Sequence, residues 1–408
     1  MSLGHRSAAK FGPFLVFSAG LLVLIGCGGS SSSSGGSSTP VNNTQALQVN
    51  LGPANNSTNE AFVAVTICAP GSSNCQTIEN VQLDTGSEGL RILSSQVSLS
   101  LPAVADTSGN ALQECVSFAD LSYVWGPVVS ADIQMAGEKA ASVPIQIISA
   151  SPAFPVPSNC ISGAGAAADN AVAALGANGI LGLGVFQQDC GGACTTASAP
   201  DMYYLCPNSV CQVSTVPLGS QLQNPVWLFP QDNNGVLISL PSVPADGAAS
   251  VSGSLIFGIG TQSDNALGSA QVYTTDNAGN FQTTYHGIAY SQSYIDSGSN
   301  GLYILDASIL GITDCSDAAG FYCPGSPVDY TATNTGLNGA KADVSFSIAN
   351  ADALFAANNG ANAAFDDLGG DNSGSFDWGL PFFYGRKVFV GIEGKLSPAG
   401  VAGPYWAY

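Results

Sequence analysis

Residues 81–93 read VQLDTGSEGLRIL, and residues 293–305 read SYIDSGSNGLYIL. The two stretches are identical at seven of thirteen positions without a gap, and their aspartates, Asp84 and Asp296, lie 212 residues apart. Each aspartate follows a short apolar segment and opens a turn that contains glycine. A single turn of this kind is common, because Asp and Gly are frequent turn residues. Two copies, one in each half of the chain, predict two homologous lobes.

The remaining sequence favours β-structure. From residue 47 onward Val, Ile, Thr, Ser and Tyr are frequent, and the 49 glycines and 22 prolines of the chain mark turns. The pattern predicts strands at 61–67, 254–257, 272–275 and 388–392, a hairpin turn at 277–280, and short helices at 306–310 and 350–357. Frequent strands joined by short turns indicate an all-β barrel or sandwich.

Charge and histidine content narrow the possible chemistry. The 408 residues include 28 Asp and Glu but only 8 Lys and Arg, which gives a formal net charge of -20. Nucleic-acid binding is therefore not expected, because it needs a basic surface. His5 lies close to the N-terminus and we expect His286 at the surface, which argues against a Ser-His-Asp triad and a multi-histidine metal site. Chemistry that uses carboxylates alone, without metal or cofactor, remains available.

The N-terminal segment has the pattern of a bacterial lipoprotein signal peptide. Residues 1–26 combine early basic residues with an apolar stretch that is short for a membrane-spanning helix. They end in Leu-Ile-Gly before Cys27, which resembles a lipobox and implies cleavage before Cys27 and lipidation of that residue. Gly28 after the cysteine implies the outer membrane of the cell envelope. An uncleaved anchor is the alternative. Residues 27–46, rich in Gly and Ser, are expected to form a flexible tether.

Ten of the eleven cysteines remain when Cys27 is set aside. Because the cell envelope outside the cytoplasm is oxidising, we expect them to form disulfides. The spacing favours the pairs Cys68–Cys75, Cys115–Cys160, Cys190–Cys194, Cys206–Cys211 and Cys315–Cys323. Two alternatives stay open for Cys190, Cys194, Cys206 and Cys211. The first pair could be cross-linked to the second pair, or the four could form a zinc site.

The two Asp loops resemble the active-site loops of the pepsin-like aspartic peptidases. In that family two homologous β lobes each contribute one aspartate from an Asp-Thr/Ser-Gly-Ser/Thr loop. Further segments match in the expected order. Residues 178–184 and 378–383 resemble the segments that thread behind the loops, and 252–258 and 387–392 resemble strands of the second lobe. The whole chain also resembles an uncharacterised bacterial lipoprotein family, the domain of unknown function 3443.

The resemblance implies an all-β fold, namely a bilobal pepsin-like double β-barrel with a cleft between the lobes. The N-terminal lobe would span residues 47–245 and carry Asp84, and the C-terminal lobe would span 246–408 and carry Asp296. The substrate would be a peptide or a protein. We expect a monomer that meets the membrane only through its lipid anchor.

The same resemblance makes Asp84 and Asp296 the catalytic residues. One carboxylate would take a proton from a water molecule while the other, protonated, polarises the peptide carbonyl; two adjacent carboxyls ionise with separated pKa values. Hydroxyl residues would tie the loops together, glycines would allow the sharp turns, and serines would donate to the outer carboxylate oxygens. The residues with these supporting roles are Thr85, Gly86, Ser87, Ser297, Gly298 and Ser299.

The sequence departs from the family pattern at two places. The stretch 116–126, where the substrate flap is expected, lacks the usual Tyr-Gly tip. Tyr123 and Trp125 are candidate flap aromatics, with packing in the core as the alternative. Arg91 stands where an apolar residue is expected beside the dyad, and a surface ion pair with Glu88 is the simplest role for it.

Three functions follow from these patterns. The first is an envelope-anchored aspartic endopeptidase. The second is a non-catalytic pepsin-like lipoprotein that binds a peptide or an envelope partner in its cleft. The third is a structural lipoprotein in which the Asp-Gly motifs are only turns, which would leave the carboxyls of Asp84 and Asp296 apart. Residues 189–212 are predicted to form an inserted surface loop, with a place at the rim of the cleft as the alternative.

Overall fold

The structure consists mainly of β-strands. The computed structural model describes residues 42–161, 166–196 and 201–408. The larger sheet contains β1 (Thr44–Val49), β2 (Ala61–Cys68), β3 (Cys75–Asp84), β4 (Glu88–Leu93), β5 (Leu112–Ser117), β6 (Tyr123–Met135), β7 (Glu138–Ile148), β8 (Gly179–Leu183), β9 (Tyr203–Leu205), β10 (Gln212–Val213), β11 (Gly235–Ser239), β12 (Val251–Phe257), β13 (Val272–Thr274), β21 (Lys387–Gly391) and β22 (Tyr405–Ala407). The smaller sheet contains β14 (Phe281–Tyr285), β15 (Ile288–Ile295), β16 (Leu302–Leu305), β17 (Val328–Thr335), β18 (Lys341–Ile348), β19 (Gly369–Gly370) and β20 (Asn372–Trp378).

Helices are short in the described residues. The α-helices are α1 (Val172–Leu175), α2 (Ala307–Leu310) and α3 (Ala351–Ala356). Single 3-10 turns occur at Ser94–Gln96, Ser158–Cys160, Gly191–Thr195, Pro207–Ser209, Leu218–Ser220, Pro225–Leu228, Ala357–Gly360 and Leu380–Phe383. The side chain of Asn350 accepts a hydrogen bond from the Ala353 amide and so caps α3. None of the described helices has the length and apolarity needed to cross a membrane.

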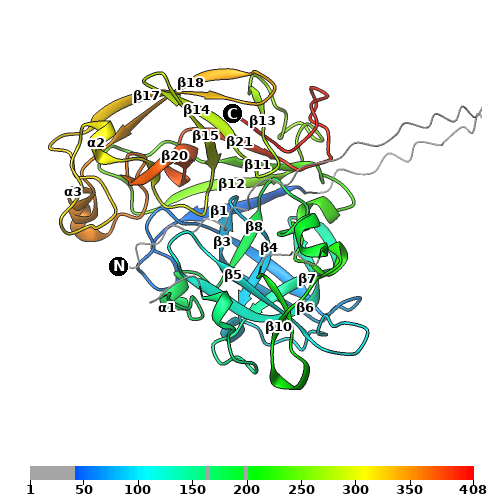
Figure 1. The fold of residues 1–408 in the computed structure, drawn as a ribbon. Coiled ribbons are helices and arrows are strands. Elements are labelled where there is room, and N and C mark those ends of the chain that lie inside the picture. Colours follow the sequence, from blue (N-terminus) through cyan, green and yellow to red (C-terminus); the bar gives the residue numbers. More distant parts are fainter. Residues whose placement is uncertain (1–41, 162–165, 197–200) are drawn as a thin grey trace, which may run out of the picture.

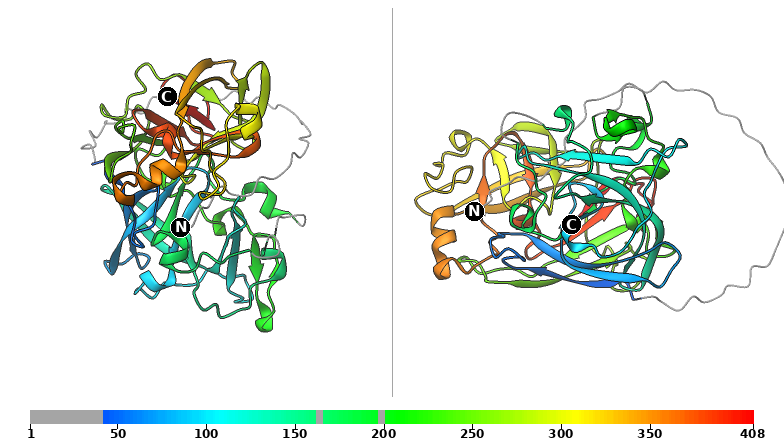
Figure 2. Two further views of the ribbon diagram at one scale, coloured as in Figure 1. Left: turned by 90° about the vertical axis from the view of Figure 1, so that its left-hand side faces the viewer. Right: turned by 90° about the horizontal axis from the view of Figure 1, so that it is seen from below.

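The strands form two lobes joined by a layer of shared strands (Figure 1). The blue-to-green lobe contains β3 to β10, and the yellow-to-orange lobe contains β14, β15, β17, β18 and β20. Both lobes remain distinct when the molecule is turned by 90° (Figure 2). The layer between them follows the order β1-β12-β11-β21, so strands from both ends of the chain pair there. The all-β, bilobal fold implied by the resemblance to pepsin-like peptidases is confirmed.

The same three-strand arrangement surrounds each aspartate loop. In the first lobe β8 runs parallel to β3 and antiparallel to β4, which are the two strands that flank Asp84. In the second lobe β20 runs parallel to β15 and antiparallel to β16, which flank Asp296. A third strand therefore holds both arms of each loop in place. In the first lobe this strand lies within the predicted segment 178–184, whereas in the second lobe it is Asn372–Trp378, and the predicted segment 378–383 shares only Trp378 with it.

The predicted lobe limits differ from the strand pairing. The tether was predicted to end at residue 46, but the structure places residues 44–46 in β1, which pairs along its whole length with β12. The predicted boundary at residue 245 separates β11 from β12, yet these two strands pair with each other. Residues 1–26 and most of the predicted tether, including Cys27, lie outside the described residues.

Most of the predicted elements are present, with one correction. β2, β12, β13 and β21 cover the four predicted strands, and α2 and α3 cover the predicted helices. A turn forms at 277–280, where the amide of Asp276 donates to the carbonyl of Asn280. The strands on either side do not form a hairpin, because β13 pairs with β22 whereas β14 pairs with β15 and β17. Distant strands outcompete the local partner here.

Candidate active site

The first aspartate lies at the end of β3 and is closed off from solvent. Asp84 is 2% exposed. Its Oδ1 accepts a hydrogen bond from the amide of Gly86 at 2.8 Å, and its Oδ2 accepts one from the hydroxyl of Ser87. These donors come from the turn itself, because the glycine lets the backbone fold back onto the carboxylate. Both oxygens are therefore oriented by the loop that carries the aspartate.

The second loop repeats this geometry. Asp296 directly follows β15 and has no exposed surface. Its Oδ1 accepts from the amide of Gly298 at 2.8 Å, and its Oδ2 accepts from the hydroxyl of Ser299 at 2.9 Å. The sequence repeat is thus a repeat of hydrogen-bond geometry as well.

The two carboxyl groups lie against each other. A Cβ atom added to Gly86 would sit 2.6 Å from Cγ of Asp296, and one added to Gly298 would sit 2.6 Å from Oδ1 of Asp84. Each glycine therefore packs directly against the opposite carboxyl, which brings the two aspartates together. This contact excludes the alternative in which the two Asp-Gly motifs are unrelated surface turns.

Reciprocal hydrogen bonds lock the loops together. The amide of Thr85 donates to Oγ of Ser297 at 3.1 Å, and the amide of Ser297 donates to Oγ1 of Thr85 at 2.9 Å. The hydroxyl of Ser297 donates in turn to the carbonyl of Leu83 at 2.8 Å, and that of Thr85 to the carbonyl of Ile295. All four residues are buried, so these bonds fix the separation of the two aspartates.

The surroundings of the dyad favour a protonated Asp296. Burial, followed by negative charge at Asp84 and at Asp377, raises the pKa of Asp296 well above its usual range. Two carboxylates in contact cannot both ionise easily, because each destabilises the charge of the other. The two packed carboxyls therefore favour a state in which the pair holds a proton.

Comparison with known proteins places the chain in a family. A family model described as "Protein of unknown function (DUF3443)" matches residues 39–408. The chain belongs to this family. Curated proteins give no match to it. Among solved structures, an aspartic proteinase from Irpex lacteus is similar, with 13% sequence identity, coverage of 89% of this chain and 96% of that chain, and a TM-score of 0.48.

Two further acidic residues of this DUF3443 chain lie beside the dyad. The sequence did not point to Asp377, and it placed Glu88 only at the surface as a partner of Arg91. Oδ2 of Asp377, near the end of β20, lies at a hydrogen-bond distance of 2.7 Å from Oγ of Ser299. Glu88, which opens β4, is 7% exposed, and burial raises its pKa to about 8. The sequence signal that could have pointed to them is an acidic residue within a segment that is otherwise apolar and therefore expected to be buried.

The predicted flap stretch forms a β-hairpin. β5 and β6 pair antiparallel, with Ser117 opposite Tyr123, and residues 118–122 form the tip. Trp125 is 3% exposed and packs edge-on against Tyr204, with ring centroids 5.2 Å apart. Trp125 therefore has the packing role given as the alternative. Tyr123 is half-buried at the base of the tip.

Arg91 does not form the predicted surface ion pair with Glu88. It is 1% exposed and donates to the backbone carbonyl of Glu88, while its Nη2 bonds the carboxylates of Glu114 at 2.6 Å and Asp189 at 3.1 Å. The hydroxyl of Tyr203 also donates to Asp189 at 2.7 Å. Burial, and then the charge of Glu114, raise the pKa of Asp189 well above its usual range. Arg91 thus links β4 to the hairpin strand β5 and to the predicted insertion.

The cysteines pair as the spacing favours. The disulfides are Cys68–Cys75, Cys115–Cys160, Cys190–Cys194, Cys206–Cys211 and Cys315–Cys323. The cross-linked pairing and the zinc site are therefore wrong for the middle four cysteines, because their sulfurs are bonded within each short loop and offer no thiolate. Cys315 and Cys323 also lie within 4.8 Å of a carboxylate oxygen of Asp352, but they too are disulfide-bonded.

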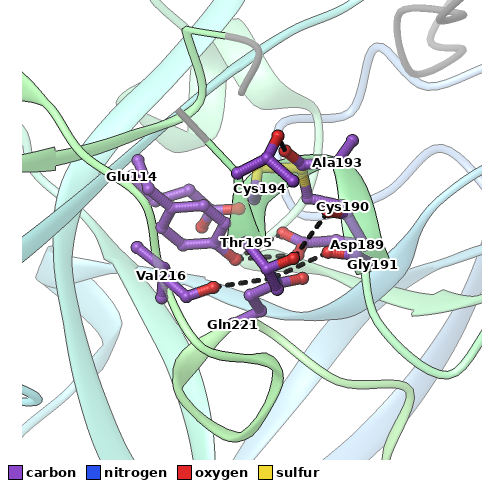
Figure 3. The surroundings of a disulfide bond; sticks show 12 residues. Glu114, Asp189, Cys190, Gly191, Ala193, Cys194, Thr195, Val216 and Gln221 are labelled. Carbon is purple, nitrogen blue, oxygen red and sulfur yellow. Dashed lines mark hydrogen bonds between the residues drawn. A yellow bond between two sulfur atoms is a disulfide. The ribbon is translucent and has the colours of Figure 1, made fainter. Parts of the chain in front are cut away.

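The Cys190–Cys194 loop is held by hydrogen bonds from its surroundings (Figure 3). The side chain of Gln221 donates to the carbonyls of Gly191 at 2.9 Å and Val216 at 3.1 Å. Asp189, which precedes the disulfide, points back toward Glu114 in this view. Outside this cluster, His286 is exposed and stacks on Tyr285, as the surface prediction expects.

Proposed function

We propose that this chain is an aspartic endopeptidase. The observation that supports the proposal is the mutual packing of Asp84 and Asp296 in two equivalent loops, each carboxyl held by one amide and one hydroxyl. Such a pair carries one proton, which is the state that general acid–base hydrolysis of a peptide needs. The one histidine among the described residues, His286, is exposed and stacks on Tyr285.

The proposed mechanism follows from the position of that proton. Asp296, with its raised pKa, would protonate or polarise the carbonyl oxygen of the scissile peptide. Asp84 would accept a proton from a water molecule placed between the two inner oxygens as that water attacks the carbonyl carbon. As the C–N bond breaks, Asp84 would give the proton taken from the water to the leaving amine, and Asp296 would take back the proton it gave to the carbonyl oxygen. The pair, which titrates as one unit, then returns to its starting state. The hydroxyls of Ser87 and Ser299 keep the outer oxygens oriented throughout.

The test replaces each aspartate by its neutral isostere. We expect Asp84→Asn and Asp296→Asn each to lower peptide turnover at least about 100-fold, because each removes a carboxyl needed for proton transfer. Cleavage of a diverse peptide library, with and without pepstatin, would be measured at acid and neutral pH. Asp343→Asn is the matched control, because Asp343 is exposed on β18. Unchanged turnover in either dyad variant would contradict the proposal.

A non-catalytic binding protein is the second candidate. It is favoured by the burial of the dyad and by Trp125, which packs within the N-terminal lobe. A folded protein that binds pepstatin or library peptides but releases no product would support this candidate. In that case Asp84→Asn would change the binding of pepstatin or of the peptides, and neither the wild type nor the variant would cleave them.

We also propose that the protein is anchored in the bacterial cell envelope through lipid on Cys27, at the outer membrane. The proposal rests on the Leu-Ile-Gly-Cys27 sequence and the Gly at position 28. Cys27→Ser should move the protein from the membrane fraction to the soluble fraction and abolish labelling by a radioactive fatty acid. Membrane association that survives this substitution would contradict lipidation at Cys27.

A further inference from the structure

Asp377 occupies a position that differs between the two lobes. By strand register Asp377 lies beside Tyr294 on β15 and opposite Tyr303 on β16. The equivalent register position in the first lobe is Ile180, which lies beside Gln82 and opposite Arg91. The duplicated architecture therefore places an apolar side chain behind one aspartate loop and a carboxyl behind the other. Asp377 has no exposed surface.

A single hydroxyl connects Asp377 to the dyad. Oγ of Ser299 lies 2.9 Å from Oδ2 of Asp296 and 2.7 Å from Oδ2 of Asp377. A serine hydroxyl has one hydrogen, so it donates to only one of two carboxylates. If both carboxyls were ionised, one oxygen would face the lone pairs of Oγ at hydrogen-bond distance without a hydrogen between them. At least one of the two therefore carries a proton that it donates to Ser299.

The first loop indicates which direction the hydrogens take. There Ser87, with an apolar neighbour in place of a carboxyl, donates to Oδ2 of Asp84. The same direction in the second loop commits the hydrogen of Ser299 to Asp296, and Asp377 must then be the donor to Ser299. In this arrangement Oδ2 of Asp296 accepts from Ser299, as Oδ2 of Asp84 does from Ser87, so the proton shared by the dyad would sit on the inner oxygens.

We propose that Asp377 is a positioning residue that holds a proton and donates it to Ser299, so that Ser299 donates its own hydrogen to Asp296. When Asp377 loses this proton, the hydroxyl of Ser299 turns toward Asp377, and Asp296 loses a donor and gains a negative neighbour. Both changes hold the dyad proton more tightly. The catalytic consequence rests on the proposed peptidase function, whereas the protonation of Asp377 does not.

The groups around Asp377 favour its neutral form. From the second dyad loop it faces Asp296, and a negative charge at Asp377 is one cause of the raised pKa of Asp296. From β16 it faces Tyr303, whose pKa is raised well above its usual range by burial and then by negative charge at Asp377 and Asp120. Asp296 and Tyr303 are both acidic groups, so each of them disfavours a negative charge at Asp377.

Proton release on unfolding tests the protonation directly and without any activity. At pH 6 an aspartate in the unfolded chain is ionised, because its pKa there is about 3.9. Unfolding the wild-type protein in an unbuffered pH-stat should therefore release about one proton more than unfolding Asp377→Asn. Asp377→Ile introduces the residue type found at the equivalent position of the first lobe, Ile180. It should also release about one proton fewer than the wild type, and it replaces Asp377→Asn in the experiment if that variant folds poorly. Asp343→Asn, an exposed control, should match the wild type. Equal proton release by the wild type and both Asp377 variants would overturn the proposal.

The pH profile of peptide turnover tests the positioning role. The acid limb should coincide in the wild type and in Asp377→Asn, because Asp377 is neutral there in both. The alkaline limb should fall about one pH unit earlier in Asp377→Asn, since no negative charge at position 377 then opposes loss of the dyad proton. A purely structural role would change turnover equally at every pH. Coincident alkaline limbs would overturn this role. If the wild type shows no turnover, the peptidase proposal fails, and the proton count alone decides the protonation of Asp377.

Discussion

Burial favours the neutral form of Glu88, and this outweighs the Phe186 amide and the charge of Arg91, which favour the ionised form. It lies at the start of β4, one residue beyond the first dyad loop, and its Oε1 accepts a hydrogen bond from the amide of Phe186 at 3.2 Å. Burial is the main cause that raises its pKa from 4.5 to about 8, and the charge of Asp84 adds to it. The neutral side chain thus limits the negative charge packed beside the dyad.

This burial predicts a pH-dependent stability. Between pH 4.5 and about 8 the native state binds a proton at Glu88 that the unfolded state has lost. The stabilisation is complete below pH 4.5 and declines as pH rises, by up to about 1.4 kcal/mol per pH unit. Glu88→Gln removes this decline, so its unfolding free energy should equal that of the wild type near pH 4.5 and exceed it at pH 8. Urea unfolding at several pH values measures both, and parallel curves would contradict the prediction.

Arg91 is the residue whose loss should cost the most stability. It is the cation between Glu114 and Asp189, and all three side chains are buried. Arg91→Met leaves two carboxyls without their cation and should lower the unfolding free energy by about 3–5 kcal/mol. Lys139→Met is the control, because Lys139 is 44% exposed where it pairs with Asp132, and should cost less than about 1 kcal/mol. Similar losses for the two variants in denaturant unfolding would show that Arg91 is not held by its ion pairs.

At the scale of elements, local sequence specified the strands and the aspartate loops but not their partners. The run of apolar residues in 61–67 is a local property, and β2 covers it. The pairing of β13 and the burial of Arg91 are not local. Arg91 finds its carboxylates 23 and 98 residues away, so a contact with the nearby Glu88 was the simpler expectation. The mutual contact of Asp84 and Asp296 became predictable only because the motif occurs twice.

The close packing of the two loops makes their glycines sensitive to substitution. Gly86→Ala would place a Cβ atom 2.6–2.7 Å from the carboxyl atoms of Asp296, which must then move away from Asp84. We expect a loss of about 1–3 kcal/mol in unfolding free energy together with loss of pepstatin binding. Gly192→Ala is the control, because no atom lies within 4 Å of its added Cβ. Thermal unfolding and inhibitor titration measure both effects. Normal pepstatin binding by Gly86→Ala would show that the two loops can move apart enough to accommodate the added Cβ atom.

At the scale of the whole molecule, the larger sheet runs from the strands of the N-terminal lobe through β1 into strands from the second half of the chain, while the strands around Asp296 form the smaller sheet. β1 comes from the N-terminal end of the described chain but pairs with β12, which belongs to the second half of the sequence. β1 also pairs with β2, so it connects the sheet of the N-terminal lobe to the shared layer. β11 extends this layer by pairing with β12 and β21. The position of the dyad between the lobes therefore depends on this layer as well as on the two loops.

β1 should accordingly be required for a stable bilobal fold. A variant that begins at residue 42 keeps β1, whereas one that begins at residue 50 exposes the edges of β2 and β12 and removes the fully buried Leu47 and Val49. Loss of these two side chains alone removes about 3–6 kcal/mol of burial, and an unpaired edge promotes association between molecules. We expect the shorter variant to unfold at a markedly lower temperature and to form oligomers in gel filtration. Equal unfolding temperatures and a monomeric shorter variant would mean that contacts outside β1 are enough to hold the lobes together. These include the hydrogen bonds between Thr85 and Ser297 and those from Asn59 to the carbonyls of Asn300 and Phe365.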